Sequence, residues 1–370
     1  MANRFERARQ ELIATPALVI DLPTIEHNLQ RLHCYAKQHG LQVRPHTKTH
    51  KSRRLARMQI EHGSVGLTVA KLGEAEVMAA ESNDLLIAYP AIDPDRRRRV
   101  AELAKSHTIR VAVDSSYGIS VLAAAAEAAG STIGILIDLN IGFPRTGAAT
   151  PKIALELAQQ VAQAGKSLRL DGILFYPGHV WAPADQQAEI LTQIDQRLAE
   201  TIALWEAHGL TANIVSGGST PTAFQSHMIR RQTEIRPGTY IYNDMNTVRA
   251  GYCTLDDCAA AVIATVVSTA VPGKCVIDAG NKTLTSDRNV LQPETGFGHV
   301  VEYPDAQIVR LSEEHGEIDF AACDSLPQLG ERVTIIPNHI CPCVNLQNHA
   351  YLQTADGIEQ DSVDARGLLT

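Results

Sequence analysis

The chain has 370 residues, and its composition and charge limit what it can be. This length is too great for one ordinary domain and suits a barrel with a smaller second domain. The formal net charge of −8 leaves no surplus of basic side chains for phosphates, so we expect no nucleic-acid partner. Seven cysteines, an odd number scattered along the chain, indicate a reducing compartment rather than a disulfide framework. Residues 1–12 contain no apolar signal segment and no run is long enough to span a membrane, so we expect a cytoplasmic protein without membrane contacts.

Short apolar runs of strand length recur along the first two thirds of the chain, and most are followed by a helical pattern. The first run, at residues 17–20, precedes a helix start at residues 21–23 with apolar positions spaced by three and four. The runs are continuous rather than alternating, as in parallel strands that are buried on both faces. Eight later runs begin at Leu41, Gly66, Leu85, Ile109, Ile133, Leu170, Asn213 and Glu234.

Eight strand–helix units are the number found in a (β/α)8 barrel, so we predict a TIM-like barrel of the α/β class over residues 1–245. The strand at residues 17–20 belongs either to this domain or to the second one. A doubly wound sheet would give a similar pattern, but no Gly-x-Gly-x-x-Gly motif follows the first strands. Beyond residue 245, strands separated by glycine turns replace the helices, which predicts a C-terminal β domain over residues 246–370. We expect its strands at residues 262–267, 275–277, 307–309 and 332–336.

Lys48 follows the first predicted barrel strand, at the end where barrels place their active sites. It lies within Arg44–Lys51, among other cations and imidazoles. Nearby positive charge and partial desolvation lower the pKa of an amine, which would make Lys48 a nucleophile for Schiff-base chemistry. The alternative is a solvated basic loop that binds an anion, and the segment alone does not decide between the two.

Other polar groups follow the later strands. The glycines and hydroxyls of Ser216–Thr220 suit a phosphate at the end of a late barrel strand, although such stretches are also ordinary turns. Tyr176 and His179 are candidate acid–base groups, and a packed ring and a helix cap are the alternatives. Arg145 and Arg236 are candidates to hold a cofactor or a carboxylate, or else form structural ion pairs.

The segment His339-Ile340-Cys341-Pro342-Cys343 is a candidate metal site. In an extended chain alternate residues share a face, so His339 and Cys341 would project together, and Cys343 has the same parity. Two protein ligands are too few for a closed structural site and imply an open, catalytic one. Two buried thiols near a strand end are the structural alternative.

With these residues in view, the chain resembles the D-threonine aldolase/D-serine dehydratase family, pyridoxal-phosphate enzymes with an alanine racemase-like barrel. The segments around Lys48 and around His339-Ile340-Cys341 are the most specific parts of the resemblance. The matching stretches cover almost the whole chain and lie at residues 15–21, 44–51, 66–70, 74–76, 216–222, 236–240 and 337–342.

The resemblance implies roles for individual residues. Lys48 would form the Schiff base with pyridoxal phosphate, and Arg236 would face its pyridine ring. His339 and Cys341, in preference to Cys343, would bind a catalytic divalent metal. The cofactor phosphate would be held by Gly218, Ser219, Thr220, Gly238 and Thr239. We assign Tyr176 to the cofactor and His179 to catalysis, and the family implies a homodimer with a shared active site.

The residue at position 341 bears on the reaction. Aldolase-type relatives often carry a carboxylate there, whereas dehydratase-type relatives carry the cysteine. A thiolate favours zinc, and a carboxylate suits manganese or magnesium, so we expect zinc with the other two as alternatives. The expected function is a lyase acting on β-hydroxy D-amino acids, of the D-threonine aldolase type, with D-serine dehydratase as the alternative. An amino-acid racemase and a non-catalytic pyridoxal-phosphate carrier are further alternatives.

Overall fold

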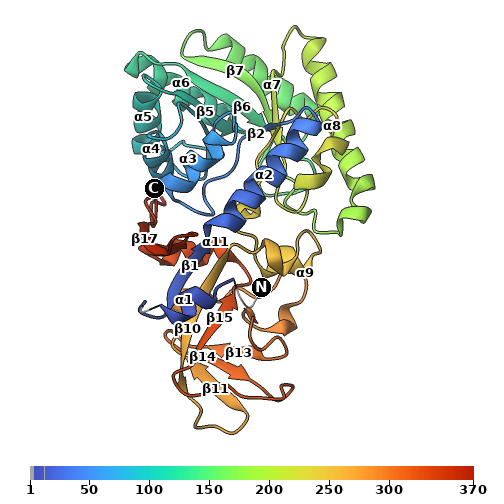
Figure 1. Ribbon diagram of the computed structural model, residues 1–370. Coiled ribbons are helices and arrows are strands. Elements are labelled where there is room, and N and C mark those ends of the chain that lie inside the picture. Colours follow the sequence, from blue (N-terminus) through green and yellow to red (C-terminus); the bar gives the residue numbers. More distant parts are fainter. Residues whose placement is uncertain (1–3, 12) are drawn as a thin grey trace. The chain divides into compact units, whose positions relative to one another are not determined.

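The computed structural model (Figure 1) describes residues 4–11 and 13–370, which form two compact units. The first, which we call the β unit, comprises the chain up to Leu29, Thr49–Lys51 and Thr239–Gly367. The second, which we call the barrel unit, comprises Gln30–Lys48, Ser52–Gly238 and Leu368–Thr370. Each unit is made of several separate segments of the chain. The single domain boundary predicted after residue 245 stays a prediction.

The barrel unit is built on eight parallel strands in the order β2-β9-β8-β7-β6-β5-β4-β3. The two outer strands meet because a parallel bridge joins His46, beyond β2, to Thr68 in β3, and Thr47 N donates to Thr68 O at 2.8 Å. This closed parallel sheet confirms the predicted α/β barrel. The strands are β2 (Gln42–Val43), β3 (Leu67–Val69), β4 (Asp84–Ile87), β5 (Thr108–Val113), β6 (Ile133–Asp138), β7 (Leu168–Leu174), β8 (Ile214–Gly217) and β9 (Glu234–Ile235).

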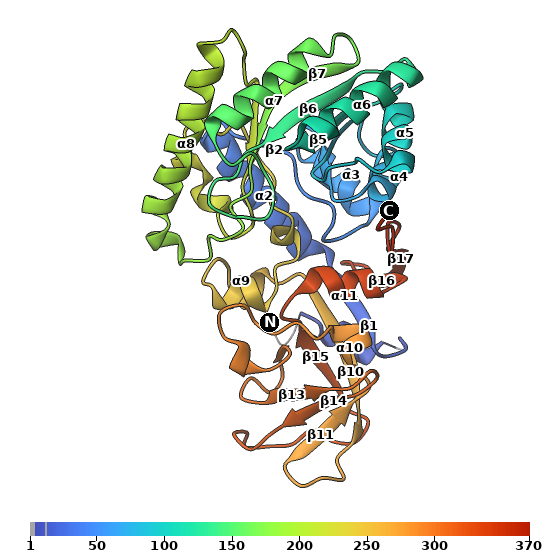
Figure 2. The same cartoon turned by 180° about the vertical axis from the view of Figure 1, so that it is seen from behind.

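Helices follow the barrel strands and lie around them, as Figures 1 and 2 show from two sides. Several begin at the residues that sequence signals indicate: the side chains of Asp93 and Thr150 accept hydrogen bonds from first-turn N–H groups, and a proline comes next in the chain. The helices are α3 (Arg53–Glu61), α4 (Leu72–Met78), α5 (Pro94–Leu103), α6 (Ser116–Ala129), α7 (Pro151–Gln163) and α8 (Ala188–Glu206), with 3-10 turns η1 (Ala184–Gln186) and η2 (Ala223–Met228); α2 (Leu22–Gln38) precedes β2.

The inside of the barrel holds an apolar layer and an ionic layer. The apolar layer consists of Leu86, Ala112, Leu136 and Leu174. Nearer the N-terminal ends of the strands, buried Arg44 Nε donates to Glu234 Oε1 at 2.9 Å, and Arg44 also pairs with Asp84 at 2.5 Å. Arg110 pairs with Asp84 as well, and with Asp171 at 2.7 Å. Because this ionic layer fills the N-terminal end of the barrel, the C-terminal ends of the strands are left for a functional site.

The β unit is built on a nine-stranded mixed sheet in the order β13-β14-β11-β10-β1-β16-β17, with β15 paired to β10 and β12. Strands β10, β11, β13 and β15 fulfil the predicted strands, whereas β12, β14, β16 and β17 were not predicted. The bounds are β1 (Ala17–Asp21), β10 (Ala260–Ser268), β11 (Lys274–Ile277), β12 (His299–Val300), β13 (Gln307–Leu311), β14 (Gly316–Asp319), β15 (Arg332–Ile336), β16 (His349–Gln353) and β17 (Ile358–Ser362). Its helices are α1 (Glu6–Gln10), α9 (Met245–Arg249), α10 (Asn281–Leu284) and α11 (Ile340–Leu346), with 3-10 turns η3 (Thr239–Ile241), η4 (Leu255–Asp257) and η5 (Pro293–Thr295).

Strand β1 is a central strand of this sheet, although it comes from the beginning of the chain. It runs antiparallel to β10, with Ala17 opposite Ile263, and parallel to β16, with Val19 opposite Tyr351. All five of its residues are buried, which explains why the run is apolar without alternation.

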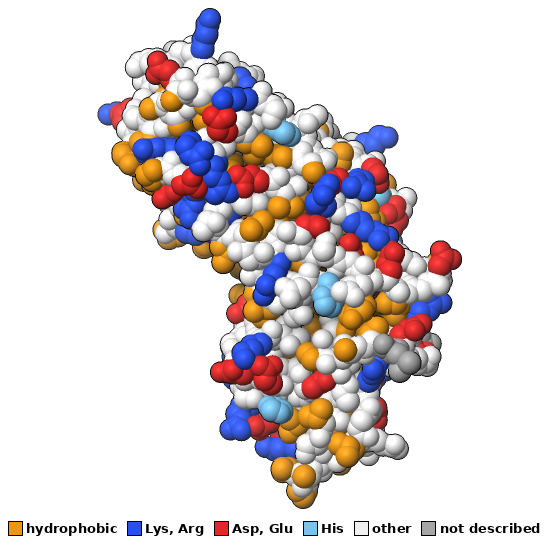
Figure 3. Space-filling model, turned by 90° about the vertical axis from the view of Figure 1, so that its left-hand side faces the viewer, with side chains coloured by type: hydrophobic (Ala, Val, Ile, Leu, Met, Phe, Trp, Pro, Cys, Tyr) orange, Lys and Arg blue, Asp and Glu red, His pale blue; other side chains and the backbone are white. Residues whose placement is uncertain are grey.

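The surface combines charges of both signs, and positive and negative side chains are interspersed over the face shown in Figure 3. None of the helices formed by the described residues combines the length and the apolar character needed to cross a membrane.

Candidate active site

Lys48 lies just beyond the C-terminal end of β2, on the rim of the barrel unit. Its position is fixed by the backbone before it, because His46 N donates to Pro237 O at 3.0 Å and Thr47 N bonds to Thr68. Lys48 N lies 3.4 Å from His46 Nδ1. The Lys48 side chain is exposed between buried neighbours, so its amine is accessible to a ligand while its backbone is held.

Arg236 follows β9 and is buried in the barrel unit. Its Nη2 donates to Phe175 O at 2.7 Å, whereas its Nε has no hydrogen-bond partner among the described residues. Burial lowers the pKa of Arg236 to about 10 although the carboxylates of Glu234 and Asp138 act in the opposite direction. An unpaired buried N–H is costly, so this guanidinium fits a bound acceptor such as a pyridine nitrogen.

The loop after β8 has the geometry of an anion cradle in the barrel unit. Gly218 has φ of +88°, a left-handed conformation that favours glycine. A Cβ on Gly217 would lie 2.0 Å from the Phe175 ring, so this position also requires glycine. Ser219 N donates to Thr222 Oγ1 at 3.1 Å, which holds the turn. The structure therefore brings the backbone and small hydroxyls together where a phosphate could be bound.

Tyr176 and His179 follow β7 and pack against Phe143 and Arg145 of the β6–α7 loop. The ring centroid of Phe143 lies 5.6 Å from that of Tyr176 and 6.3 Å from that of His179. The Arg145 guanidinium lies 4.9 Å from the centroid of Tyr176. Phe143 was missed in the sequence because an aromatic residue in a loop carries no chemical signal of its own.

His179 is placed to act as a base. Burial lowers the pKa of His179, so the ring is neutral near pH 7. Its Nδ1 is buried and lacks a hydrogen-bond partner within the described part of the chain. A pocket of about 530 Å³ adjoins His179 and is lined by residues of the β6–α7 loop and of α8, including Asn140 and Arg197. A neutral imidazole beside a pocket suits general-base chemistry.

Asp138 ends β6 and lies in the barrel unit close enough to Arg236 to interact electrostatically. It accepts a hydrogen bond from Thr146 Oγ1 at 2.7 Å. Burial raises the pKa of Asp138, although Thr146 and the arginines act in the opposite direction.

His339 and Cys341 lie at the start of α11 in the β unit. The extended chain assumed for this segment was wrong beyond His339, because α11 begins at Ile340. Pro342 falls in the first turn of the helix, where a missing N–H costs little. The His339 and Cys341 side chains nevertheless form a hydrogen bond with each other.

The surroundings of this pair supply charge and hydroxyl groups. His339 Nδ1 lies 2.9 Å from Asp287 Oδ2, and Cys341 Sγ lies 3.2 Å from Thr49 Oγ1 and 3.7 Å from Thr239 Oγ1. Burial lowers the pKa of His339, but the hydrogen bond to Cys341 and the negative charges nearby outweigh burial and raise the pKa to about 9. Asp287 was missed because it lies 52 positions away in the chain and in no motif.

Cys343 has a different environment from Cys341. Its thiol contacts the carbonyl oxygens of Leu284 at 3.2 Å and of His339 at 3.3 Å, and burial raises the pKa of this thiol. Within residues 4–11 and 13–370, no three His, Cys, Asp or Glu side chains are placed together to hold a metal. A thiol, an imidazole and a carboxylate on the second ring nitrogen nevertheless fit an open transition-metal site with two protein ligands.

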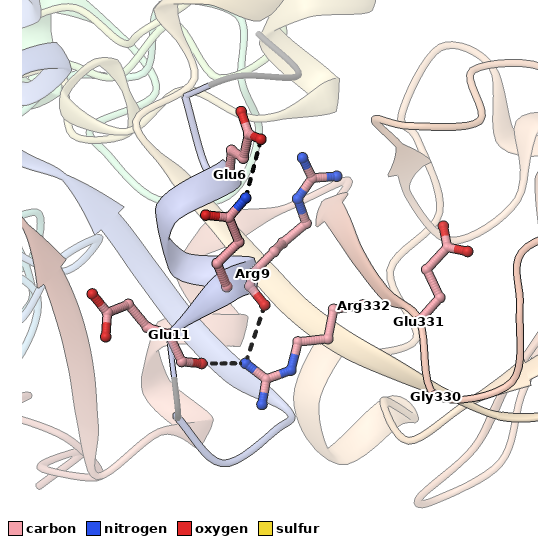
Figure 4. A pocket seen from close by; sticks show the side chains of 7 residues that line it. Glu6, Arg9, Glu11, Gly330, Glu331 and Arg332 are labelled. Atoms are coloured by element: carbon pink, nitrogen blue, oxygen red, sulfur yellow. Dashed lines mark hydrogen bonds between the residues drawn. The ribbon is translucent and has the colours of Figure 1, made fainter.

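A second pocket, of about 490 Å³, lies in the β unit next to α1 (Figure 4). It is lined by charges of both signs, and the guanidinium of Arg332 donates to the backbone oxygens of Arg9 and Glu11. It contains none of the site residues predicted from the sequence.

A closed parallel barrel with a lysine beyond its first strand, together with a separate mixed sheet, is the fold of an alanine racemase-like protein. The family described as alanine racemase, N-terminal domain, matches residues 20–246, and a putative serine dehydratase domain matches residues 259–353. The chain belongs to this alanine racemase-type family and carries the serine dehydratase domain after its barrel.

Relatives of known activity match almost the whole chain. The structure of D-threonine aldolase from Filomicrobium marinum has a TM-score of 0.89 and 33% identity, covering 97% of each chain. The 3-hydroxy-D-aspartate aldolase of Paracoccus denitrificans (strain Pd 1222) is 30% identical over 91% of this chain and 87% of its own. The D-threo-3-hydroxyaspartate dehydratase of Delftia sp. (strain HT23) is 30% identical over 88% of this chain and 90% of its own.

Two mutant structures of D-threo-3-hydroxyaspartate dehydratase, both 27% identical to this chain, are also similar to it. A cysteine-to-alanine mutant in the metal-free form has a TM-score of 0.88 and covers 95% of this chain and 97% of its own. A histidine-to-alanine mutant has a TM-score of 0.87, and its changed position is two residues before that cysteine. Together, the comparisons confirm the predicted family and the predicted enzyme class, a pyridoxal-phosphate-dependent lyase.

Proposed function

We propose that this protein is a pyridoxal-phosphate- and divalent-metal-dependent lyase of β-hydroxy D-amino acids, and that it cleaves them to glycine and an aldehyde. The observation that carries the metal-dependent lyase assignment is the hydrogen-bonded His339–Cys341 pair with its attached carboxylate, and the neutral His179 beside its pocket supports cleavage. A racemase on the same barrel needs no such pair, and a cofactor carrier needs no β unit.

The residues of the barrel unit suit pyridoxal phosphate. The exposed amine of Lys48 would hold the cofactor covalently, and the unpaired Nε of Arg236 would gain a partner in the pyridine ring. The bound cofactor supplies an electron sink that stabilises negative charge at the substrate Cα. In the proposal the cofactor-binding residues are Lys48, Tyr176, Gly218, Ser219, Thr220, Arg236, Gly238 and Thr239.

His339 and Cys341 would hold the divalent metal, for which we propose zinc because a thiolate favours it over manganese and magnesium. A metal ion there would polarise an oxygen as a Lewis acid. The histidine and cysteine changed in the dehydratase mutant structures are two positions apart, as His339 and Cys341 are. Thr49 and Thr239, which contact Cys341, directly follow Lys48 and Gly238 in the chain.

His179 is the proposed base in the cleavage reaction. In cleavage, the neutral ring of His179 accepts the proton of the substrate β-hydroxyl, and the Cα–Cβ bond then breaks with its electron pair left on Cα. Low pKa and a buried, unpaired Nδ1 support this role for His179.

Dehydration to a 2-oxo acid and ammonia is the second candidate reaction, and Cys341 is the observation that favours it. The dehydratase whose mutants are described above has a cysteine two residues after a histidine, as this chain has. In this reaction the amine of Lys48, when it is not bound to the cofactor, would remove the proton from the substrate Cα. The hydroxyl group on the substrate Cβ would then leave.

Product analysis with D-threonine and D-serine tests the proposal. Glycine with an aldehyde means cleavage, and a 2-oxo acid with ammonia means elimination. If the chelator-treated protein interconverts D- and L-amino acids at an undiminished rate, the protein is a racemase and the proposal fails.

Borohydride reduction followed by peptide mapping tests the cofactor assignment. We expect one pyridoxyl group, on Lys48. A label on Lys51 or on any other lysine contradicts the assignment.

We further propose that the enzyme works as a homodimer, as the family resemblance implies, and that it works in the cytoplasm, as its cysteine usage suggests. We propose residues 1–245 as the cofactor-binding domain, with the strand at residues 17–21 joining the sheet of the other domain, and residues 246–370 as the domain with the metal ligands.

A further inference from the structure

We propose that Asp287 is a positioning residue that fixes the orientation of His339 as a metal ligand. This inference rests on the proposed metal site and adds a residue to it that neither the sequence motifs nor the comparisons indicate.

The contact between the two side chains determines which ring nitrogen is available. His339 Nδ1 lies 2.9 Å from Asp287 Oδ2, so the Nδ1–H donates to the carboxylate and Nε2 is the ring nitrogen left to bind a metal, which would displace the Nε2 proton. A carboxylate on the second nitrogen of a ligating histidine also makes that ligand more basic. Both side chains are partly exposed, 41% for His339 and 47% for Asp287, and exposed ion pairs add little stability. The pair is therefore better explained by ligand orientation than by folding.

The backbone around Asp287 is held from two directions. Asn338, the residue before His339, is 1% exposed, and its Nδ2 donates to Asp287 O at 3.1 Å and to Gly296 O at 2.8 Å. Thr285 Oγ1 accepts from Asp287 N at 3.3 Å. Thr285 has φ of +65°, a conformation that is costly for a β-branched residue and persists where surrounding contacts enforce it. The segment with Asp287 is thus built against the segment with His339.

A second carboxylate, that of Asp244, holds the backbone between His339 and Cys341. Buried Asp244 accepts from Ile340 N at 3.1 Å through Oδ2, and from Thr247 N at 3.1 Å through Oδ1. Ile340 lies between His339 and Cys341, so Asp244 holds the backbone between the ligands while Asp287 orients the imidazole.

The test is the zinc affinity of the cofactor-loaded protein, measured by competition with a fluorescent chelator. We expect Asp287→Ala to bind zinc about 10- to 100-fold more weakly than the wild type. Asp287→Asn keeps an acceptor but loses the charge, so its affinity should lie between the two. Asp324→Ala removes an exposed carboxylate of the same unit and serves as the control, with unchanged affinity.

Two further readouts separate positioning from a structural role. The melting temperature of the metal-free protein and the visible absorbance of its bound cofactor should be the same in Asp287→Ala and in the wild type. An affinity loss accompanied by a lowered metal-free melting temperature overturns the inference, as does equal affinity of Asp287→Ala and wild type. If the wild type itself binds no zinc, manganese or magnesium, the proposed metal site fails and this inference fails with it.

Discussion

In the proposed metal site the thiol of Cys341 would set the metal preference, because the two proposed protein ligands are one soft sulfur and one imidazole nitrogen. We expect Cys341→Asp to lower the affinity for zinc and to raise the relative affinity for manganese, since a carboxylate is a hard ligand. Competition titrations with both metals measure the ratio of the two dissociation constants. Cys34→Asp, at an exposed position of α2, is the control and should leave that ratio unchanged. An unchanged ratio in Cys341→Asp would argue against Cys341 as a ligand.

His33 makes the stability of the barrel unit depend on pH. Burial and the charge of His62 lower the pKa of His33 to about 4, whereas the unfolded chain has about 6.5. Between these two pKa values His33 is protonated in the unfolded chain but neutral in the folded protein. Because the unfolded state binds one proton more, the free energy of unfolding falls as pH is lowered from about 6.5 towards 4. Urea unfolding at pH 7 and pH 5 should therefore show a smaller loss of stability for His33→Gln than for the wild type. His208→Gln, at an exposed position, should lose as much as the wild type.

Residues with reactive groups were easier to predict than residues that support them. Lys48, Arg236 and the His339–Cys341 pair became candidates because a potentially nucleophilic amine, a guanidinium and two potential metal ligands are conspicuous at strand ends. Asp287 and Asp244 act through contacts between segments distant in the sequence, and no local spacing reveals such contacts.

Helix α11 depends on Asp244 for its first turn. The same carboxylate caps α9 through Thr247 N and bonds to Ile340 N, so two helices begin at one buried side chain. Removing a buried charged acceptor with two partners is expected to cost about 3 kcal/mol in Asp244→Ala, measured by urea unfolding. Asp93→Ala removes the exposed cap of α5 and should cost about 1 kcal/mol. Equal losses in the two variants would show that Asp244 is an ordinary cap.

The mistaken extended chain at residues 339–341 shows a limit of pattern analysis. The segment follows the apolar strand β15, and an extended chain was expected to continue through it. Proline is at home in the first turn of a helix, and only the contact with Asp244 identifies Ile340 as the first residue of α11.

Long apolar runs made the barrel predictable. All eight predicted runs became strands, because strands buried on both faces are largely apolar apart from the charged residues of the ionic layer. The closure of the sheet was predicted only from the count of eight strand–helix units, since β2 and β9 have two residues each and the contact of His46 with Thr68 is a single bridge. In the β unit, strands β14 and β17 were not predicted because they are short and carry charged residues.

The position of β1 predicts how fragments of the chain should behave. A fragment of residues 1–238 contains β1 but neither β10 nor β16, so the buried strand Ala17–Asp21 would expose both of its edges. We expect this fragment to associate, and a fragment of residues 22–238 to be monodisperse, in size-exclusion chromatography with light scattering. Monodisperse behaviour of the longer fragment would contradict the expectation.

The same strand also constrains the order of events during synthesis. The ribosome finishes β1 at residue 21, but the partners of this strand lie at residues 260–263 and 351–353. At about 5–20 residues per second, the interval is on the order of tens of seconds. The barrel strands are complete by residue 235, so they can pair while the chain is still being made. Among the described strands, β1 is therefore one of the last to find its neighbours, and for that interval its backbone edges stay unpaired and its apolar side chains lack their native contacts.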